Sequence, residues 1–451
     1  MPETLFPPRF VWGASTSAYQ IEGSPLADGA GPSIWHRFCR TPGKVANGET
    51  GEPACDHYHR WKDDVALMKR LGLQGYRFSI AWGRILPEGR GRVNQKGLDF
   101  YRRLVDELAA SGIEPMATLY HWDLPAALDD LGGWTNRDVV GWFADYAEVL
   151  FRALDDRVRW WATINEPWVV MDGGYLHGGL APGHASPYEA PIVAHNLLLA
   201  HGEAVAAYRA IGKNQIGIVL NLEPKDPASD SAEDRDATRL ADAQVNRHFL
   251  DPLFRGSYPE EMSEIYGDGW PELPRSDFDV IRRPMDFLGI NYYTRGVTAA
   301  DPSVPYIRSR RVPQPGRLRN TLGWEVRPES LTELLVRVHR DYTRLPLFIT
   351  ENGGAFYDPP SPIDGRVEDP LRIHYLRTHL LAAAEAIRGG VDLRGYFVWS
   401  LMDNFEWSLG YAQRFGIVHV DYRTQQRTPK QSAEFYSEVI RTGGANLARG
   451  A

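Results

Sequence analysis

The sequence contains only two cysteines, Cys39 and Cys55, among its 451 residues. Two cysteines exclude a disulfide framework and a four-cysteine zinc site. The sequence has no Asn-x-Ser/Thr acceptor for N-glycosylation, and no stretch approaches the roughly 18 consecutive apolar residues of a membrane span. The opening segment, residues 1–19, lacks the basic and then apolar runs of a signal peptide. These absences predict a soluble cytoplasmic protein without a membrane partner, in which both thiols are reduced.

The chain also lacks an excess of positive charge. It has 50 lysines and arginines and 58 aspartates and glutamates, which gives a net charge of −8. Proteins that bind the phosphate backbone usually carry a basic face, so we expect no nucleic-acid partner. The content of 43% hydrophobic and 12% aromatic residues excludes a disordered chain. Several of the 14 tryptophans adjoin charged or amide residues, as at 121–123 and 166–168. Flat rings beside hydrogen-bonding groups suit a sugar ligand, but they equally suit the packing of a large core.

The chain alternates between amphipathic segments that end at glycine and short apolar segments rich in β-branched and aromatic residues. A helical stripe of Trp61, Val65 and Met68 ends at Gly72, for example, and a strand-like segment follows. This alternation predicts repeated βα units around a parallel sheet. Eight strands are predicted, the number that closes a parallel barrel. They are 10–14, 75–80, 113–120, 160–164, 216–222, 287–293, 347–350 and 395–401.

We therefore expect an α/β fold, a single (β/α)8 TIM barrel over residues 1–451. An open doubly wound sheet is the alternative, but no Gly-x-Gly-x-x-Gly motif follows any predicted strand. Irregular stretches at 223–236, 301–327 and 355–368 follow the fifth, sixth and seventh strands, and we expect long loops there on the C-terminal face of the strands. The arginines of the middle stretch are expected to decorate a solvated rim; they are Arg308, Arg310, Arg311, Arg317 and Arg319.

Polar residues gather where the predicted strands end, and in a TIM barrel these ends form the active-site face. They are Gln20, Arg77, His121, Asn165, Glu166, Asn291, Tyr293, Glu351 and Glu406. Two of them, Glu166 and Glu351, each follow an apolar strand and would face one another across the barrel mouth. Glycoside hydrolysis needs paired carboxyl groups, one to protonate the leaving oxygen and one to react with the sugar carbon. A single glutamate more often caps a turn or pairs with an arginine, but this pair with its flanking aromatic residues favours catalysis.

Several long motifs surround these residues. They are 10–23 (Phe-Val-Trp-Gly-Ala-Ser-Thr-Ser-Ala-Tyr-Gln-Ile-Glu-Gly), 120–125 (Tyr-His-Trp-Asp-Leu-Pro), 163–167 (Thr-Ile-Asn-Glu-Pro), 291–294 (Asn-Tyr-Tyr-Thr), 349–353 (Ile-Thr-Glu-Asn-Gly) and 399–407 (Trp-Ser-Leu-Met-Asp-Asn-Phe-Glu-Trp). Through these motifs, in this order, the chain resembles the bacterial β-glucosidases of glycoside hydrolase family 1 over nearly its whole length.

The resemblance implies a retaining enzyme that hydrolyses terminal non-reducing β-D-glucosyl residues through a covalent glycosyl-enzyme, with β-galactosidase and β-fucosidase side activity. It implies that Glu166 is the acid/base and Glu351 the nucleophile, and that Tyr293, Arg77 and Asn291 support the nucleophile. The implied substrate-binding residues are Gln20, His121, Trp122, Asn165, Trp324 (on the aglycone side), Trp399, Glu406, Trp407 and Phe415. The expected substrates are β-glucosides and cello-oligosaccharides, and neither a metal nor a cofactor is expected.

Two alternatives remain at this point. A catalytically silent sugar-binding relative would be expected to lack one of the two carboxylates. A 6-phospho-β-glycosidase would be expected to have a small residue in place of Glu406, followed by Ser, Lys and Tyr that hold a phosphate. His57 and His59 are spaced like a metal pair, but they have no third ligand nearby, which favours a structural role at a helix start. The sequence leaves the oligomeric state open, a homo-oligomer included.

Overall fold

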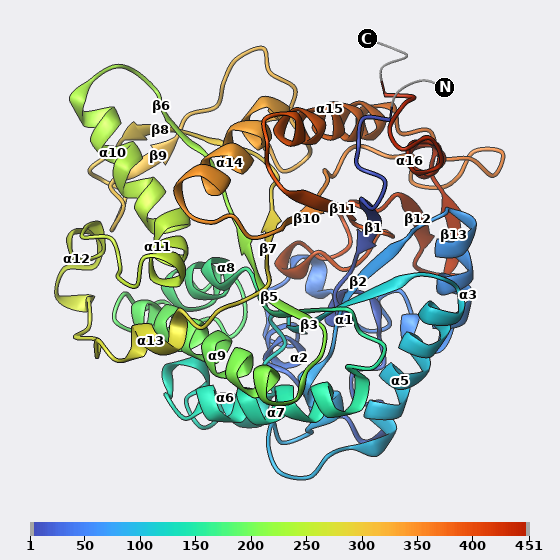
Figure 1. Ribbon diagram of the computed structural model, residues 1–451, viewed down its shortest axis with the longest axis horizontal. Helices are drawn as coiled ribbons and strands as arrows, with labels where there is room; N and C mark the ends of the chain where they lie inside the picture. The colour runs from blue at the N-terminus through green and yellow to red at the C-terminus, as the bar shows by residue number, and fades with distance from the viewer. Residues whose placement is uncertain (1–3, 448–451) are drawn as a thin grey trace.

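The computed structural model describes residues 4–447, whose eight main strands form a closed parallel barrel (Figure 1). Around the barrel the strands follow the order β1-β11-β10-β7-β5-β4-β3-β2, so each strand lies beside its neighbours along the chain. The barrel strands are β1 (Val11–Ser15), β2 (Gly75–Ser79), β3 (Glu114–Tyr120), β4 (Trp160–Asn165), β5 (Gln215–Asn221), β7 (Phe287–Asn291), β10 (Leu347–Asn352) and β11 (Leu393–Trp399).

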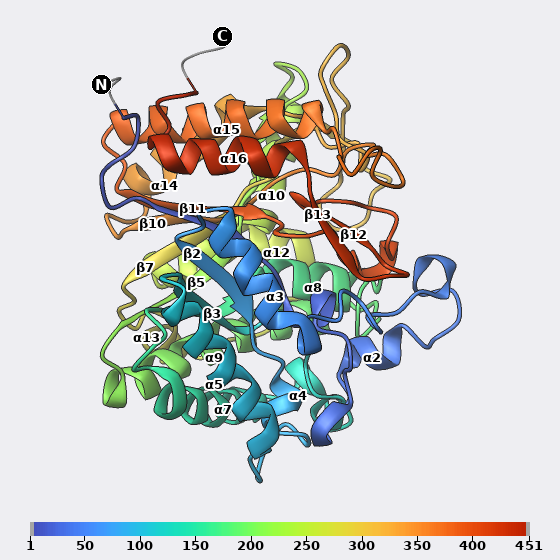
Figure 2. The ribbon, with the colours of Figure 1, turned by 90° about the vertical axis from the view of Figure 1, so that its right-hand side faces the viewer.

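Helices connect the barrel strands and surround the barrel, and α15 and α16 lie side by side on one flank (Figure 2). The longer helices are α3 (His57–Arg70), α5 (Gln95–Ala110), α7 (Val139–Leu154), α9 (Glu189–Ile211), α10 (Ala232–Asp242), α14 (Pro328–Asp341), α15 (Pro370–Arg388) and α16 (Gln431–Thr442). The shorter ones are α1 (Ala18–Ile21), α2 (Ile34–Phe38), α4 (Trp82–Ile85), α6 (Ala126–Asp129), α8 (Pro167–Met171), α11 (His248–Phe254), α12 (Glu261–Tyr266) and α13 (Asp277–Ile281).

Large apolar side chains fill the barrel interior beneath the strand ends that carry the polar residues. This cluster, which we call the barrel floor, consists of Met116, Trp160, Phe287, Phe348 and Phe397. The rings of Trp160 and Phe348, from strands that are not neighbours, have centroids 5.6 Å apart, so they meet inside the barrel. A Cβ atom at Gly13 would lie 2.4 Å from the Phe397 ring, so a glycine is required there. The barrel is therefore a packed core and not a pore.

All eight predicted strands are present, and the predicted TIM barrel is confirmed. Their ends agree with the prediction to within two residues. The largest shifts include β7, which ends at Asn291 and leaves Tyr292 and Tyr293 in the following loop. Hydrophobicity does not mark that end, because the tyrosines continue the apolar pattern of the strand.

The prediction that residues 223–236 and 301–327 are wholly irregular is wrong. Strands β6 (Lys225–Pro227), β8 (Gly296–Ala300) and β9 (Ser309–Arg311) form a separate three-stranded sheet, seen beside α10 in Figure 1. The short strands β6 and β9 have no apolar alternation that a sequence pattern could reveal.

The remaining strands, β12 (Val418–Asp421) and β13 (Gln426–Pro429), pair as an antiparallel hairpin. Within residues 4–447, no helix combines the length and the apolar character needed to cross a membrane. Cys39 and Cys55 are both free and buried. Burial raises the pKa of both thiols, which disfavours the reactive thiolate.

Candidate active site

The C-terminal ends of the barrel strands surround a cavity of about 360 Å³. The residues predicted from the sequence that line it are His121, Trp122, Glu166, Asn291, Tyr293, Trp324, Glu351, Trp399, Glu406, Trp407 and Phe415. The three other predicted residues, Gln20, Arg77 and Asn165, lie behind this lining and hydrogen-bond to it. The structure thus brings the predicted site residues together in one place.

Glu351 lies near the C-terminal end of β10, and its side chain is buried. Arg77 Nη1 donates to Glu351 Oε1 over 2.5 Å, and the Tyr293 hydroxyl donates to Oε2 over 2.6 Å. Burial raises the pKa of Glu351, and the charge of Arg77 and the hydrogen bond from Tyr293 oppose that rise. Both carboxylate oxygens therefore accept hydrogen bonds that favour the charged form.

Glu166 follows β4 directly and precedes the short helix α8. Its side chain is also buried, and Asn291 Nδ2 donates to Glu166 Oε1 over 2.7 Å. Burial, followed by the charge of Glu351, raises the pKa of Glu166 to about 8. Near neutral pH the two carboxyl groups therefore differ, because Glu166 holds a proton and Glu351 has donors for its negative charge.

Both strands that carry a carboxyl group are irregular where they reach the cavity. The β4–β5 pairing shifts register between Ala162 and Asn165, and the β10–β7 pairing shifts between Ile349 and Glu351. Glu166 itself has a φ of 49°, in the left-handed region. Such irregularities re-aim side chains next to active sites, and here they occur at the positions of the two glutamates.

Two amides connect the carboxyl groups. Arg77 Nη2 donates to Asn165 Oδ1 over 2.5 Å, and Asn291 Nδ2 donates to the same oxygen over 3.1 Å. Asn165 Nδ2 lies 3.1 Å from Nε2 of His121. Burial and the charge of Arg77 lower the pKa of His121 well below its usual value, so the ring is neutral. A continuous hydrogen-bonded path therefore joins Glu166 to Glu351.

A third carboxyl group, Glu406, lies on the loop after β11. Gln20 Nε2 donates to Phe405 O over 2.9 Å and to Asn404 Oδ1 over 3.0 Å, and reaches Glu406 Oε2 at 3.4 Å. Burial, followed by the charge of Glu351, raises the pKa of Glu406 to about 8. Glu406 thus lines the cavity, and Gln20 contacts it from behind the lining.

Aromatic rings form the walls between these polar groups. The rings of His121 and Trp399 stack with centroids 5.8 Å apart, and Trp122 and Trp407 lie 4.7 Å apart. On another side of the cavity, Tyr293 and Trp324 have centroids 5.5 Å apart. The cavity lining therefore combines flat aromatic faces with hydrogen-bonding groups, a combination that suits a sugar.

Comparison with known proteins assigns this architecture to a family. The sequence model of glycosyl hydrolase family 1 matches residues 2–445. The chain belongs to glycosyl hydrolase family 1. Beta-glucosidase A of Thermotoga maritima is 51% identical over 445 residues, which cover 97% of this chain and 98% of the relative. Beta-glucosidase A of Acetivibrio thermocellus is 47% identical over 448 residues, which cover 98% of this chain and all of the relative, 100%.

Solved structures of family 1 enzymes have the same fold. The family 1 β-glucosidase from Thermotoga maritima superposes with a TM-score of 0.94 at 50% sequence identity, covering 97% of this chain and 98% of that one. The same enzyme in complex with isofagomine lactam also gives a TM-score of 0.94 at 50% identity, covering 98% and 99% of the two chains.

Further residues of this family 1 chain line the same cavity, although the sequence did not indicate them as site residues. They are Trp168, Val169, Leu180, Asn221, Leu222, Glu223, Thr294, Arg311, Ser408 and Leu409. Trp168 carried a signal, since it follows the Asn-Glu-Pro motif directly. Leu180 and Leu222 carried none, because the path of a loop decides which of its apolar residues face a cavity.

Arg311 has an exposed side chain, as predicted for its group of arginines, and this exposed position lies at the active-site cavity. It lies in β9 and pairs with Glu223, which also accepts from Lys225. Both Arg311 and Glu223 line the cavity. Pairing of β9 with β8 is what carries the arginine there.

His57 and His59 do not form a metal pair in this family 1 chain. His57 is the first residue of α3, and its Nδ1 lies 2.8 Å from Oδ2 of the buried Asp64. His59 Nδ1 instead contacts Asp56 at 2.6 Å. The part of the chain that the structure describes has no group of three or more His, Cys, Asp or Glu residues that could hold a metal ion.

Proposed function

We propose that this chain is a retaining β-glucosidase that hydrolyses terminal non-reducing β-D-glucosyl residues. The observation that carries the proposal is the pair of buried carboxyl groups, Glu166 and Glu351, in contrasting environments within one cavity. Retaining glycosidases need one carboxyl group that gives up a proton and one carboxylate that attacks the sugar. The relatives named beta-glucosidase, at 51% and 47% identity over nearly the whole chain, support the same activity.

In the first step the Glu351 carboxylate bonds to the anomeric carbon as the bond from that carbon to the leaving oxygen breaks. Glu166 gives its proton to the leaving oxygen, so the aglycone departs as a neutral alcohol. Arg77 and Tyr293 favour the charged Glu351, and a pKa of about 8 keeps Glu166 protonated near neutral pH.

In the second step water displaces Glu351 from the sugar. Formation of the ester removes the negative charge of Glu351, which had raised the pKa of Glu166. Glu166 therefore becomes more acidic, and its carboxylate takes a proton from the attacking water. The sugar leaves with its β configuration retained, and Glu351 is again a free carboxylate.

The remaining predicted residues are proposed to hold the sugar. Trp399 offers a stacking surface, with Trp122, Trp407 and Phe415 around it. Gln20, His121, Asn165 and Glu406 offer donors and acceptors to the hydroxyl groups. Trp324, at the side of the cavity next to Tyr293, is proposed to contact the aglycone.

Unphosphorylated β-glucosides and cello-oligosaccharides are the proposed substrates, with side activity on β-galactosides and β-fucosides. A relative from Thermotoga neapolitana that is 49% identical over 445 residues is named 1,4-beta-D-glucan glucohydrolase, which supports glucan fragments as substrates. Glu406 is anionic or neutral according to pH, and in either form it offers a phosphate group no positive charge. This argues against the 6-phospho-β-glycosidase alternative, and the presence of both Glu166 and Glu351 argues against a silent relative.

The single domain over residues 1–451 and the cytoplasmic location stay predictions from the sequence. Activity without a metal or cofactor is likewise a prediction. We expect dialysis against a strong chelator to leave the rate of hydrolysis unchanged. Loss of activity that a divalent metal restored would contradict it.

The proposed function is tested with nitrophenyl β-glucoside and its 6-phosphate. We expect a higher kcat/KM for the unphosphorylated substrate, and nuclear magnetic resonance should show β-glucose as the first product. A higher kcat/KM for the 6-phosphate would contradict the substrate class. An α-anomer as the first product would contradict the retaining mechanism.

A further inference from the structure

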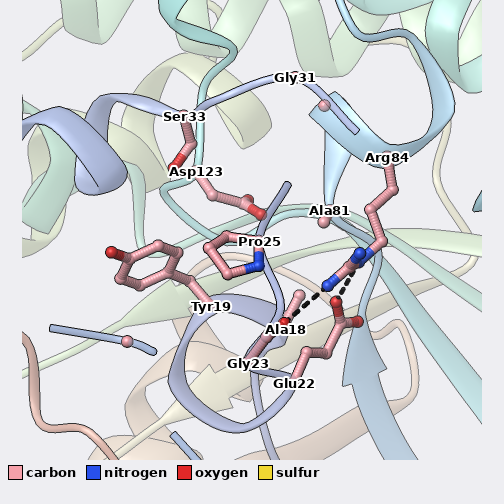
Figure 3. Close-up of a pocket in the computed structure, with 12 residues that line it drawn as sticks. Ala18, Tyr19, Glu22, Gly23, Pro25, Gly31, Ser33, Ala81, Arg84 and Asp123 are labelled. Atoms are coloured by element: carbon pink, nitrogen blue, oxygen red, sulfur yellow. Dashed lines mark hydrogen bonds and ion pairs between the residues drawn. The ribbon is translucent and has the colours of Figure 1, made fainter. Parts of the chain in front are cut away.

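A second, smaller cavity of about 30 Å³ is lined in part by Asp123, the residue that follows His121 and Trp122 in the chain (Figure 3). None of the residues that line it also lines the active-site cavity. Its polar lining includes Glu22, Arg84 and Asp123. A cavity needs roughly 10–15 Å³ to hold one water molecule, and the water needs polar partners, so this cavity has room for one or two.

Two buried polar atoms at this cavity have no hydrogen-bond partner within residues 4–447. They are Oδ1 of Asp123 and Nη1 of Arg84, whose residues are only 3% exposed. In Figure 3 the two side chains reach toward the same space from different sides. Buried polar atoms in native proteins are nearly always paired with protein groups or with ordered water. An acceptor and a donor that line one small cavity therefore point to a shared water molecule.

The rest of the Arg84 side chain is firmly held. Its Nε donates to Glu22 Oε2 over 2.7 Å, and its Nη2 donates to Gly23 O over 2.8 Å. Glu22 also accepts from the Tyr101 hydroxyl over 2.6 Å, and the Arg84 guanidinium lies 4.1 Å from the centre of the Tyr58 ring. Nη1 is the one nitrogen of this guanidinium that has no partner within residues 4–447.

Asp123 in turn faces the backbone of its own turn. The backbone N–H groups of Asp123 and His121 lie close to its carboxyl group and act to lower its pKa. Burial and the charge of Glu22 outweigh them and raise that pKa to about 8. Near neutral pH the carboxyl group can thus donate to a water molecule with one oxygen and accept from the backbone with the other.

The turn needs such support, because Trp122 has a φ of 81°, which residues other than glycine rarely adopt. The Trp122 indole donates to Asn165 O over 3.0 Å, and Asn165 contacts His121 and Arg77. The conformation at Trp122 therefore sets the place of two rings in the active-site cavity.

We propose that Asp123 is a positioning residue, which holds the turn at His121 and Trp122 through its backbone contacts and through a water molecule shared with Arg84. This inference rests on the proposed function, because it takes His121 and Trp122 to contact the sugar. Loss of the carboxyl group would let the turn relax, and displacement of a substrate-binding group by about 1 Å can cost roughly 10²-fold in rate.

The test compares Asp123→Ala with Asp123→Asn, whose amide can still accept from the backbone and donate to the water. We expect D123A to lower kcat/KM for nitrophenyl β-glucoside by roughly 10–100-fold and to weaken the binding of deoxynojirimycin, measured by calorimetry. We expect D123N to stay within about 3-fold of the wild type in both. If D123A does not fold, Asp123→Ser takes its place, because serine has a shorter side chain than aspartate. We expect this variant to lower kcat/KM and to weaken inhibitor binding as well.

Asp155→Ala is the matched control. Asp155 is also buried, but it accepts from Trp161 Nε1, the Tyr208 hydroxyl and Lys213 N near the amino end of β4. We expect D155A to lower the melting temperature and to leave kcat/KM and inhibitor binding unchanged. If D123A behaved like D155A, or if D123N lost as much activity as D123A, the positioning role would be wrong. An inactive wild type would contradict the proposed function, whereas inhibitor binding would still test the role of Asp123.

Discussion

The floor and the mouth of the barrel are built from the same strands, but they hold opposite kinds of side chain. The floor packs Trp160, Phe287, Phe348 and their neighbours into an apolar cluster. The mouth buries several carboxyl groups, and burial is the largest cause of the raised pKa of Glu166, Glu351 and Glu406. The floor therefore stabilises the fold through packing. The mouth is destabilised by its buried carboxyl groups, which the reaction requires.

Among substitutions in the floor and the mouth, Glu351→Ala in the mouth should have the largest effect on activity. It removes the proposed nucleophile, and we expect kcat to fall roughly 10⁴–10⁶-fold, as when members of a catalytic group are removed. Azide can then attack the substrate directly, so any product should be the inverted α-glucosyl azide. A β-glucosyl azide from this variant would mean that the roles of Glu166 and Glu351 must be exchanged.

Glu166→Ala should have the next largest effect, with a different pattern. Dinitrophenolate leaves without protonation, so the first step with dinitrophenyl β-glucoside should remain fast. The second step lacks its base, at a cost of roughly 10²–10⁴-fold, and a burst of dinitrophenolate should precede slow turnover. Azide needs no deprotonation and should restore turnover, giving the retained β-glucosyl azide. Absence of a burst would show that Glu166 is needed before the glycosyl-enzyme forms.

Tyr293→Phe should change the pH dependence more than the maximal rate. The hydroxyl donates to Glu351 and helps to hold its pKa down. Without that donor the pKa of Glu351 rises, so the carboxylate is lost at a higher pH as the solution is acidified. The acid limb of kcat/KM should therefore move to higher pH, while the alkaline limb, set by Glu166, should keep its place. An unchanged acid limb with a lower plateau would mean that Tyr293 acts on the sugar instead.

Phe348→Ala, in the floor, should have the smallest effect on activity and a large one on stability. Truncation of a buried phenylalanine costs about 3–5 kcal/mol, to be measured by urea unfolding, with Phe348→Leu as a milder control. We expect kcat/KM per folded molecule to stay within about 3-fold of the wild type. A loss beyond 10-fold without unfolding would show that the floor and the mouth are not separate.

The sequence was most informative where local pattern and tertiary role coincide. Each barrel strand contains an apolar run of several residues, so all eight could be recognised, and glycines at 72, 112, 212 and 389 mark the ends of four of the preceding helices. Strand β9 could not, because Ser309–Arg311 is polar and becomes a strand only by pairing with β8. The same pairing explains why the place of Arg311 in the cavity was missed.

The two carboxyl groups could be predicted because each lies at the C-terminal end of a barrel strand, Glu351 within the last residues of β10 and Glu166 directly after β4. The hydrogen bonds that connect them could not be predicted from the sequence. Asn165 contacts Arg77, His121 and Asn291, and these four residues lie on four different strands or strand ends. The cavity at Asp123 could not be predicted from the sequence either. It depends on Arg84, which is distant in sequence and approaches only in the folded chain.

The three-stranded sheet of β6, β8 and β9 has a consequence for how this scaffold can diversify. Its strands lie in the segments between β5 and β7 and between β7 and β10, and they carry Arg311 to the lining of the cavity. The hydrogen bonds to Glu166 and Glu351 come from Arg77, Asn291 and Tyr293, outside this sheet. Insertions or exchanges in this sheet can therefore alter which leaving group the cavity accepts. Glu166, Glu351 and their hydrogen-bond donors would remain unchanged.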